Sequence, residues 1–264
     1  MRVMRRISYM SSDQLPFGSG LMTPIVKVLL WTNIAVFILS TLSSQIQYWV
    51  NVIFGLTPQL VLTRFWIWQP ITYMFLHGGL THILFNMLVL WMFGVQMERL
   101  WGSRFFLRYY FITGFGAGCF TILASLLPFS FADPTYSAVT IGASGAIYGL
   151  LAAFAIYYPE TPILMFFLFP VPAKYFVMII GTISFLSVPR GDGVAHIAHL
   201  SGLLIGFFYL KKIRGLSIPG LRFGRVGAMA EIKYRYVKWK MRRLKKQFDV
   251  YPGNKNDNWR DRTH

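Results

Sequence analysis

The chain has few charged residues and a single cysteine. Asp, Glu, Lys and Arg make up 13% of its 264 residues, about half the share that is usual in a soluble domain. One cysteine excludes a disulfide within the chain, and the apolar neighbours of Cys119 are typical of a small core residue and not of a nucleophile. Among the charged residues the acidic ones are scarce, with nine Asp and Glu against 26 Lys and Arg. This composition excludes an ordinary soluble domain.

Hydrophobic residues are abundant instead, at 55% of the chain with a mean hydropathy of +0.49. A helix that spans a bilayer needs about 20 predominantly apolar residues. We therefore predict an all-α membrane protein, a bundle of six transmembrane helices at Ile25–Leu42, Ile83–Met97, Phe105–Leu127, Ser144–Tyr158, Ala173–Val188 and Val194–Leu210. The prolines of the apolar run Pro162–Pro172 favour a re-entrant or interfacial stretch that leads into the fifth helix.

The basic residues are distributed unevenly around the six predicted helices. Because cytoplasmic segments carry the excess of Lys and Arg, we assign both termini to the cytoplasm. That assignment places 24 basic residues inside and leaves only Arg64 and Arg190 outside. The start of the chain lacks a signal-peptide pattern, so we expect the first helix to act as the insertion signal. The compact six-helix layout suggests a bacterial inner membrane.

The sequence divides into a cytoplasmic segment at 1–24, a six-helix domain at 25–210 and a basic cytoplasmic tail at 211–264. The tail holds 16 basic and 4 acidic residues, and its segment Lys233–Phe248 interleaves cations with apolar side chains. This pattern is typical of an amphipathic helix on anionic lipid. A nucleic-acid patch would have similar electrostatics, but no nucleic-acid fold signature is present. We expect the lipid bilayer, and no nucleic acid, as the partner of the tail.

Three predicted helices carry a chemically reactive side chain near the same end. The second, fourth and sixth helices all run from outside to inside, so His82, Ser144 and His199 share a depth near the outer surface. The fourth helix has about 15 residues and is about 22 Å long, shorter than a hydrocarbon layer of about 30 Å. We expect this short helix to be recessed, with Ser144 in a wet cavity lined by protein.

Ser144 and His199 are predicted to act together as a catalytic dyad. The fourth and sixth helices each carry two glycines four residues apart, a spacing that suits close helix packing in general. These glycines are Gly145, Gly149, Gly202 and Gly206. Close approach would bring the hydroxyl within hydrogen-bond distance of the imidazole. No carboxylate is well placed to complete a triad, and Tyr148, one turn below Ser144, is the best-placed stacking partner for His199.

Donors for a developing oxyanion are present at two places. The start of the fourth helix offers the backbone amides of Ala143 and Ser144 together with the positive end of the helix dipole. His82 and Asn86 are four residues apart, so they project from one face of the second helix towards the same cavity. Polar groups at membrane depth are costly and usually mark function. Hydrogen bonding between helices is the alternative role for this pair.

The motifs around His82, Ser144 and His199, in this order along the chain, resemble those of the rhomboid family of intramembrane serine proteases. The resemblance covers Ile25–Leu210 and includes Glu98, which is structural in the family, before Gly102-Ser103. Its main motifs are His82-Ile83-Leu84-Phe85-Asn86, Gly142-Ala143-Ser144-Gly145, and Ala198-His199-Leu200-Ser201-Gly202 with Gly206. It implies Ser144 as nucleophile, His199 as general base and acid, His82 and Asn86 as oxyanion donors, and Tyr148 as the stacking tyrosine.

His196 competes with His199 for the role of base, because it lies three residues earlier on nearly the same helical face. Only His199 has glycines three and seven residues further along, as the family pattern requires. The expected function is a serine endopeptidase that cuts transmembrane segments of other membrane proteins near the outer leaflet and needs no cofactor or metal.

Two other functions stay open. An inactive rhomboid-like protein would bind membrane proteins without cutting them, although such relatives lack the nucleophile or the base, and both are present here. A metal site or transporter could use His77, His82, His196 and His199. Against a metal site, the sequence has no intramembrane acid near these histidines, and it has no His-Glu-x-x-His signature.

Overall fold

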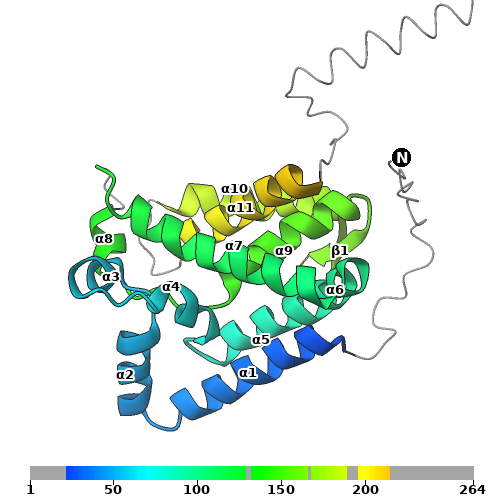
Figure 1. Ribbon diagram of the computed structural model, residues 1–264. Helices are drawn as coiled ribbons and strands as arrows, with labels where there is room; N and C mark the ends of the chain where they lie inside the picture. The colour runs from blue at the N-terminus through cyan, green and yellow to red at the C-terminus, as the bar shows by residue number, and fades with distance from the viewer. Residues whose placement is uncertain (1–21, 129–131, 166–167, 189–195, 215–264) are drawn as a thin grey trace, which may run out of the picture. The chain divides into compact units, whose positions relative to one another are not determined.

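The computed structural model is mostly helical and describes residues 22–128, 132–165, 168–188 and 196–214 (Figure 1). The predicted N-terminal segment and the amphipathic part of the tail lie outside the described residues. The elements, in chain order, are α1 Pro24–Ser40, α2 Ser44–Phe54, α3 Pro58–Arg64, α4 Gln69–Thr72, η2 Tyr73–Phe75, α5 Leu80–Val89, η3 Leu90–Gly94, α6 Val95–Trp101, α7 Ser103–Ala124, α8 Ala132–Ser137, α9 Ser144–Tyr157, β1 Pro162–Met165, β2 Phe169–Pro172, α10 Ala173–Ser187 and α11 His196–Arg214.

Each of the six predicted spans coincides with a helix. The second is a continuous 22-residue helix, Leu80–Trp101, made of α5, η3 and α6, and the third is the 22-residue α7. Among the described residues, these two helices are long and apolar enough to cross a membrane, whereas α1, α9 and α10 are apolar but shorter. The predicted shortness of the fourth helix is confirmed, because α9 has 14 residues.

The expectation of an all-α chain was wrong between α9 and α10. There the predicted re-entrant stretch forms an antiparallel hairpin, in which Pro162 pairs with Pro172 and Met165 pairs with Phe169. A two-stranded hairpin has two edge strands, and prolines are tolerated at sheet edges because the missing N–H is not needed for pairing. At its base, Lys174 Nζ and Glu160 Oε1 form an ion pair at 2.6 Å.

Four short α-helices, together with the short 3-10 helix η2, lie between the predicted spans and were not foreseen. α2, α3, α4 and α8 lie at one end of the bundle, whereas α6 and β1 lie at the other (Figure 1). The buried Gln69 joins this group, because its Oε1 accepts a hydrogen bond from Thr57 N at 3.0 Å and its Nε2 donates to Val52 O at 3.1 Å. The hydrogen bonds of Gln69 therefore join α4 to α2 and to the residue before α3.

α9 is the central helix, packed most extensively against α11 and α7. The contact with α11 depends on glycine, because a Cβ built on Gly202 would overlap the carbonyl oxygen of Gly145. A Cβ on Gly206 would lie 2.9 Å from the Cα of Gly149. The glycine pairs predicted from spacing therefore meet across one interface.

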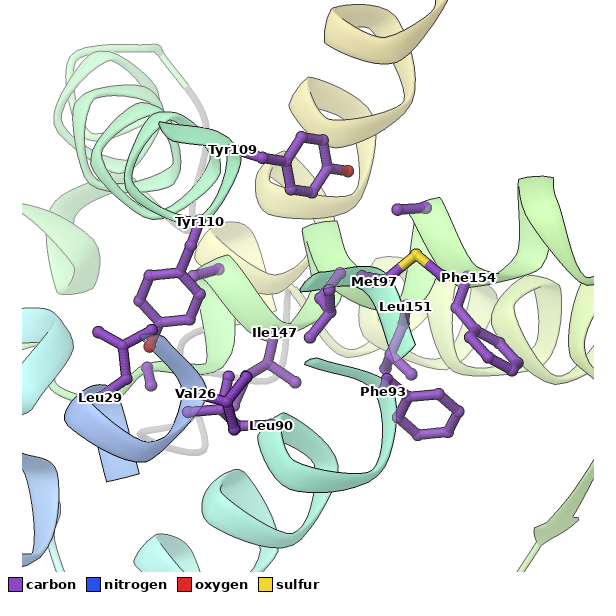
Figure 2. Close-up of a cluster of buried hydrophobic side chains, with 14 of the residues drawn as sticks. Val26, Leu29, Leu90, Phe93, Met97, Tyr109, Tyr110, Ile147, Leu151 and Phe154 are labelled. Carbon is purple, nitrogen blue, oxygen red and sulfur yellow. The ribbon is translucent and has the colours of Figure 1, made fainter. Parts of the chain in front are cut away.

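Large apolar side chains fill the other faces of α9. Ile147, Leu151 and Phe154 point towards residues of α1, η3 and α6 (Figure 2). The rings of Phe154 and Phe93 meet edge to face with centroids 4.7 Å apart. Close packing of these buried side chains holds α9 in place.

Glu98 joins the start of α1 to the end of α6. Its carboxylate accepts hydrogen bonds from Ile25 N at 3.1 Å, Val26 N at 2.9 Å and Ser103 Oγ at 2.5 Å. The first N–H groups of a helix have no partner within the helix, and a negative charge there also complements the helix dipole. Glu98 therefore has the structural role that the resemblance implied.

The glycine contact between α9 and α11 can be tested by adding one methyl group. Gly202→Ala forces a Cβ against the backbone of α9, so we expect it to lower the free energy of unfolding by about 1–3 kcal/mol, the usual cost of overpacking. Thermal unfolding in detergent would measure this. In the control Gly181→Ala, the new Cβ would meet only Leu203 Cδ1 at an ordinary 3.4 Å, and the melting temperature should hold or rise. Equal melting temperatures for Gly202→Ala and the wild type would contradict the close approach.

Candidate active site

Ser144 is the first residue of α9, where the chain turns sharply into the helix. Gly142 has a φ of 122°, a conformation that glycine adopts readily and other residues rarely do. Its N–H donates to Tyr73 O at 2.9 Å, and Thr140 exchanges two backbone hydrogen bonds with Leu56. The irregular backbone before Ser144 is thus hydrogen-bonded to other parts of the protein.

The hydroxyl of Ser144 lies beside the imidazole of His199. The distance from Ser144 Oγ to His199 Nε2 is 2.7 Å, within hydrogen-bond range. Two acids have partners elsewhere, Glu98 at the start of α1 and Glu160 with Lys174. This arrangement can pass a proton from the hydroxyl to the imidazole.

The ring of His199 is stacked on Tyr148. The ring centroids are 4.4 Å apart and the planes differ by only 5°. Tyr148 follows Ser144 by four residues on α9, so the same helix presents both the hydroxyl and the ring that orients the imidazole. The stacking partner predicted from the sequence is therefore present.

His82 reaches the same site from α5. A Cβ built on Gly142 would lie 2.7 Å from His82 Nε2 and 3.7 Å from Ser144 Oγ, so both side chains adjoin Gly142. Gly78 N donates to His82 Nδ1 at 3.4 Å. A neutral imidazole that accepts at Nδ1 carries its proton on Nε2. His82 can therefore present a hydrogen-bond donor next to Ser144.

The other predicted oxyanion donors are Asn86 and the backbone amides of Ala143 and Ser144. Asn86 is buried, and its Nδ2 donates to the carbonyl of His82 at 2.8 Å, so one of its N–H bonds is used within α5. Ala143 is fully buried and directly precedes α9. The first amides of a helix carry unsatisfied N–H groups that attract negative charge.

The two remaining histidines flank the site. His77 is buried with its ring centroid 5.0 Å from that of His82. Burial, and to a lesser degree the neighbouring His82, lowers the pKa of His77 to about 4, so its ring is neutral at physiological pH. The ring of His196 meets that of His199 edge to face at 6.0 Å. The histidine that lies within hydrogen-bond distance of Ser144 Oγ is His199.

Two residues that support the site were missed by sequence reasoning. Tyr73 accepts the hydrogen bond from Gly142 N, and its hydroxyl donates to Gly114 O at 2.7 Å. Ser184 on α10 donates to the hydroxyl of Tyr148 at 3.4 Å. Neither residue belongs to a motif, and both act through contacts between segments distant in sequence, so no local pattern could have found them.

Comparison with known proteins agrees with this geometry. A family model described as the Rhomboid domain matches residues 64–215, more than half of the chain. The chain is 35% identical over 158 residues to the "Rhomboid protease AarA" of Providencia stuartii, covering 56% of each protein. It is 34% identical over 175 residues to the "Rhomboid protease GluP" of Bacillus subtilis, covering 66% of this chain and 31% of the relative.

Relatives also occur outside bacteria. "Rhomboid-like protein 15" of Arabidopsis thaliana is 30% identical over 170 residues, covering 63% of this chain and 41% of the relative. The matches thus span about a third to just over half of the relatives' lengths. The matched domain contains α5 to α11 and, with them, Ser144, His199, Tyr148, His82 and Asn86. The chain belongs to the rhomboid family of integral membrane proteins.

Proposed function

We propose that this protein is an intramembrane serine endopeptidase that cleaves transmembrane segments of other membrane proteins near the outer leaflet. The observation that carries the proposal is the 2.7 Å contact between Ser144 Oγ and His199 Nε2. The two relatives that are named rhomboid proteases support the same reaction class.

In the proposed mechanism, Ser144 is the nucleophile and His199 acts first as base and then as acid. His199 Nε2 takes the hydroxyl proton while Ser144 Oγ attacks the carbonyl carbon of the scissile bond, which forms a tetrahedral intermediate. The protonated imidazole then gives its proton to the leaving amine, and an acyl-enzyme remains on Ser144. His199 next takes a proton from water, which attacks the acyl-enzyme, and returns it to Ser144 as the acid product leaves.

The negative oxygen of the tetrahedral intermediate needs donors that are fixed in advance. We assign this role to His82, Asn86 and the backbone amides of Ala143 and Ser144. Support comes from the position of His82 Nε2 beside Gly142 and from the location of Ser144 at the start of α9. The glycines Gly142, Gly145, Gly202 and Gly206 allow this assembly, because a side chain at any of them would intrude on a neighbour.

We propose six membrane spans, with both termini in the cytoplasm of a bacterium and the short α9 recessed below the outer surface. The six apolar helices at the predicted positions and the excess of Lys and Arg on the inner side support this topology. Bacterial relatives occur among the similar proteins, as do plant and mitochondrial ones. The basic tail after α11 would lie on anionic lipid.

An inactive rhomboid-like binding protein is the alternative function. The presence of both Ser144 and His199 in hydrogen-bond contact favours an active enzyme. A metal site has less support, because the described part of the chain holds no group of three or more His, Cys, Asp and Glu side chains that could bind a metal ion.

The dyad predicts how single and double variants behave. Ser144→Ala should abolish cleavage of a model transmembrane substrate and leave the melting temperature nearly unchanged, because a small hydroxyl contributes little packing. His199→Ala should cause a similar loss, and the double variant should lose nothing further, because the two residues work as one unit.

His196→Ala is the matched control for the histidine, since it removes an imidazole one turn away on α11. We expect it to retain clear activity. Cleavage by Ser144→Ala, or loss of activity in His196→Ala with retention in His199→Ala, would contradict the assignment.

The oxyanion role predicts a loss of turnover without a loss of binding. His82→Ala and Asn86→Ala should each lower kcat by about 10²- to 10³-fold, as removal of an oxyanion donor typically does. KM should change little, because the lost interaction exists only in the transition state. The measurement is kcat per active site, titrated with a covalent serine inhibitor, together with the melting temperature.

Asn33→Ala offers a matched control for the buried amide. Asn33 on α1 is also buried and donates to the carbonyl four residues earlier, Leu29 O, at 2.8 Å. Its loss should lower stability at most, with normal turnover per site. If His82→Ala and Asn86→Ala behave in the same way, with reduced stability and normal turnover, their role is structural and the oxyanion assignment is wrong.

A further inference from the structure

The orientation of His199 depends on a tyrosine that needs its own support. The imidazole and the ring of Tyr148 lie almost parallel, at 4.4 Å and 5°. Rotation of Tyr148 about its ring bond would break this parallel stack, and ring torsions of aromatic side chains have broad minima. A group that holds the tyrosine ring would therefore also hold the plane of the catalytic imidazole.

Such a group is present on α10. Ser184 Oγ donates a hydrogen bond to the hydroxyl of Tyr148 at 3.4 Å. Ser184 is only 2% exposed, although it lies on a helix whose large side chains are mostly exposed. Burial of a hydroxyl is costly unless it is hydrogen-bonded. An apolar helix gains nothing in packing from a buried serine in place of an alanine, so the contact with Tyr148 gives this serine a specific role.

We propose that Ser184 is a positioning residue for the base, acting through Tyr148. The serine fixes the far end of the tyrosine ring, the ring fixes the imidazole plane of His199, and that plane directs Nε2 at Ser144 Oγ. Ser184 itself touches neither the substrate nor the reacting atoms. The inference rests on the proposed dyad and extends it to a third helix, α10, which contributes no residue to the dyad or to the proposed oxyanion donors.

The effect of Ser184 should be visible in turnover. Ser184→Ala leaves Tyr148 without this partner, so we expect kcat per titrated active site to fall roughly two- to tenfold, the effect of one neutral hydrogen bond, with KM unchanged. Tyr148→Phe keeps the stacked ring but removes the same bond, and should cause a similar fall. The double variant should be no slower than either single variant, because both changes break one interaction.

Two further variants separate positioning from packing. Ser184→Thr keeps a hydroxyl and should restore most of the turnover that Ser184→Ala loses. Ser187→Ala removes a buried hydroxyl from the same helix, one turn further on, and should leave kcat unchanged. Multiplicative losses in the double variant, an unchanged kcat in Ser184→Ala, or an equal loss in Ser187→Ala would overturn the inference.

A spectroscopic readout tests the proposal independently of proteolysis. In protein labelled with ¹³C and ¹⁵N in histidine, stacking on Tyr148 shifts the ring resonances of His199, which are assigned by their loss in His199→Ala. Ser184→Ala should move these resonances, whereas Ser187→Ala should not. Unmoved resonances in Ser184→Ala would reject the positioning role even if the protein cleaves no substrate. Absence of cleavage and of serine labelling in the wild type would instead reject the proposed function.

Discussion

The close approach of α9 and α11 at their glycines is the contact on which the candidate site depends. Gly202 lies against the carbonyl of Gly145, and Gly206 lies against Gly149, so the two helix backbones touch directly at these glycines. Only at this separation can side chains as short as Ser144 and His199 meet at 2.7 Å. Backbone packing of this kind suits a bilayer, where helices associate through close contact and not through the hydrophobic effect.

The site is built mainly on helices and depends little on flexible loops. α9 presents both the hydroxyl and the stacking ring, α11 presents the imidazole, and α5 presents His82. Groups held on rigid elements keep the geometry that a reaction needs without reordering at each turnover. Among the described residues, the imidazole of His199 is held by its stack on Tyr148. Support of this kind explains why residues outside any motif, such as Tyr73 and Ser184, matter to the site.

Much of this arrangement could be predicted because it follows from helical periodicity. Apolar length located the six helices, and four-residue spacing placed Tyr148 below Ser144 and paired the glycines. The short helices near Ser144 could not be predicted, because they depend on contacts such as that of Gln69 with Val52 O. The hairpin at Pro162–Pro172 was missed because a short apolar run has no distinctive period. The bond from Asn86 to His82 O is likewise invisible in a motif that names only residue types.

The most direct test of the central claim is to label the purified protein with a serine-reactive fluorophosphonate in the presence of a metal chelator and map the modified residue by mass spectrometry. A dyad predicts modification at Ser144, no label in Ser144→Ala, and strongly reduced label in folded His199→Ala, because the hydroxyl needs the imidazole to become nucleophilic. Failure of the folded wild-type protein to react, or label at another serine that persists in Ser144→Ala, would contradict the account.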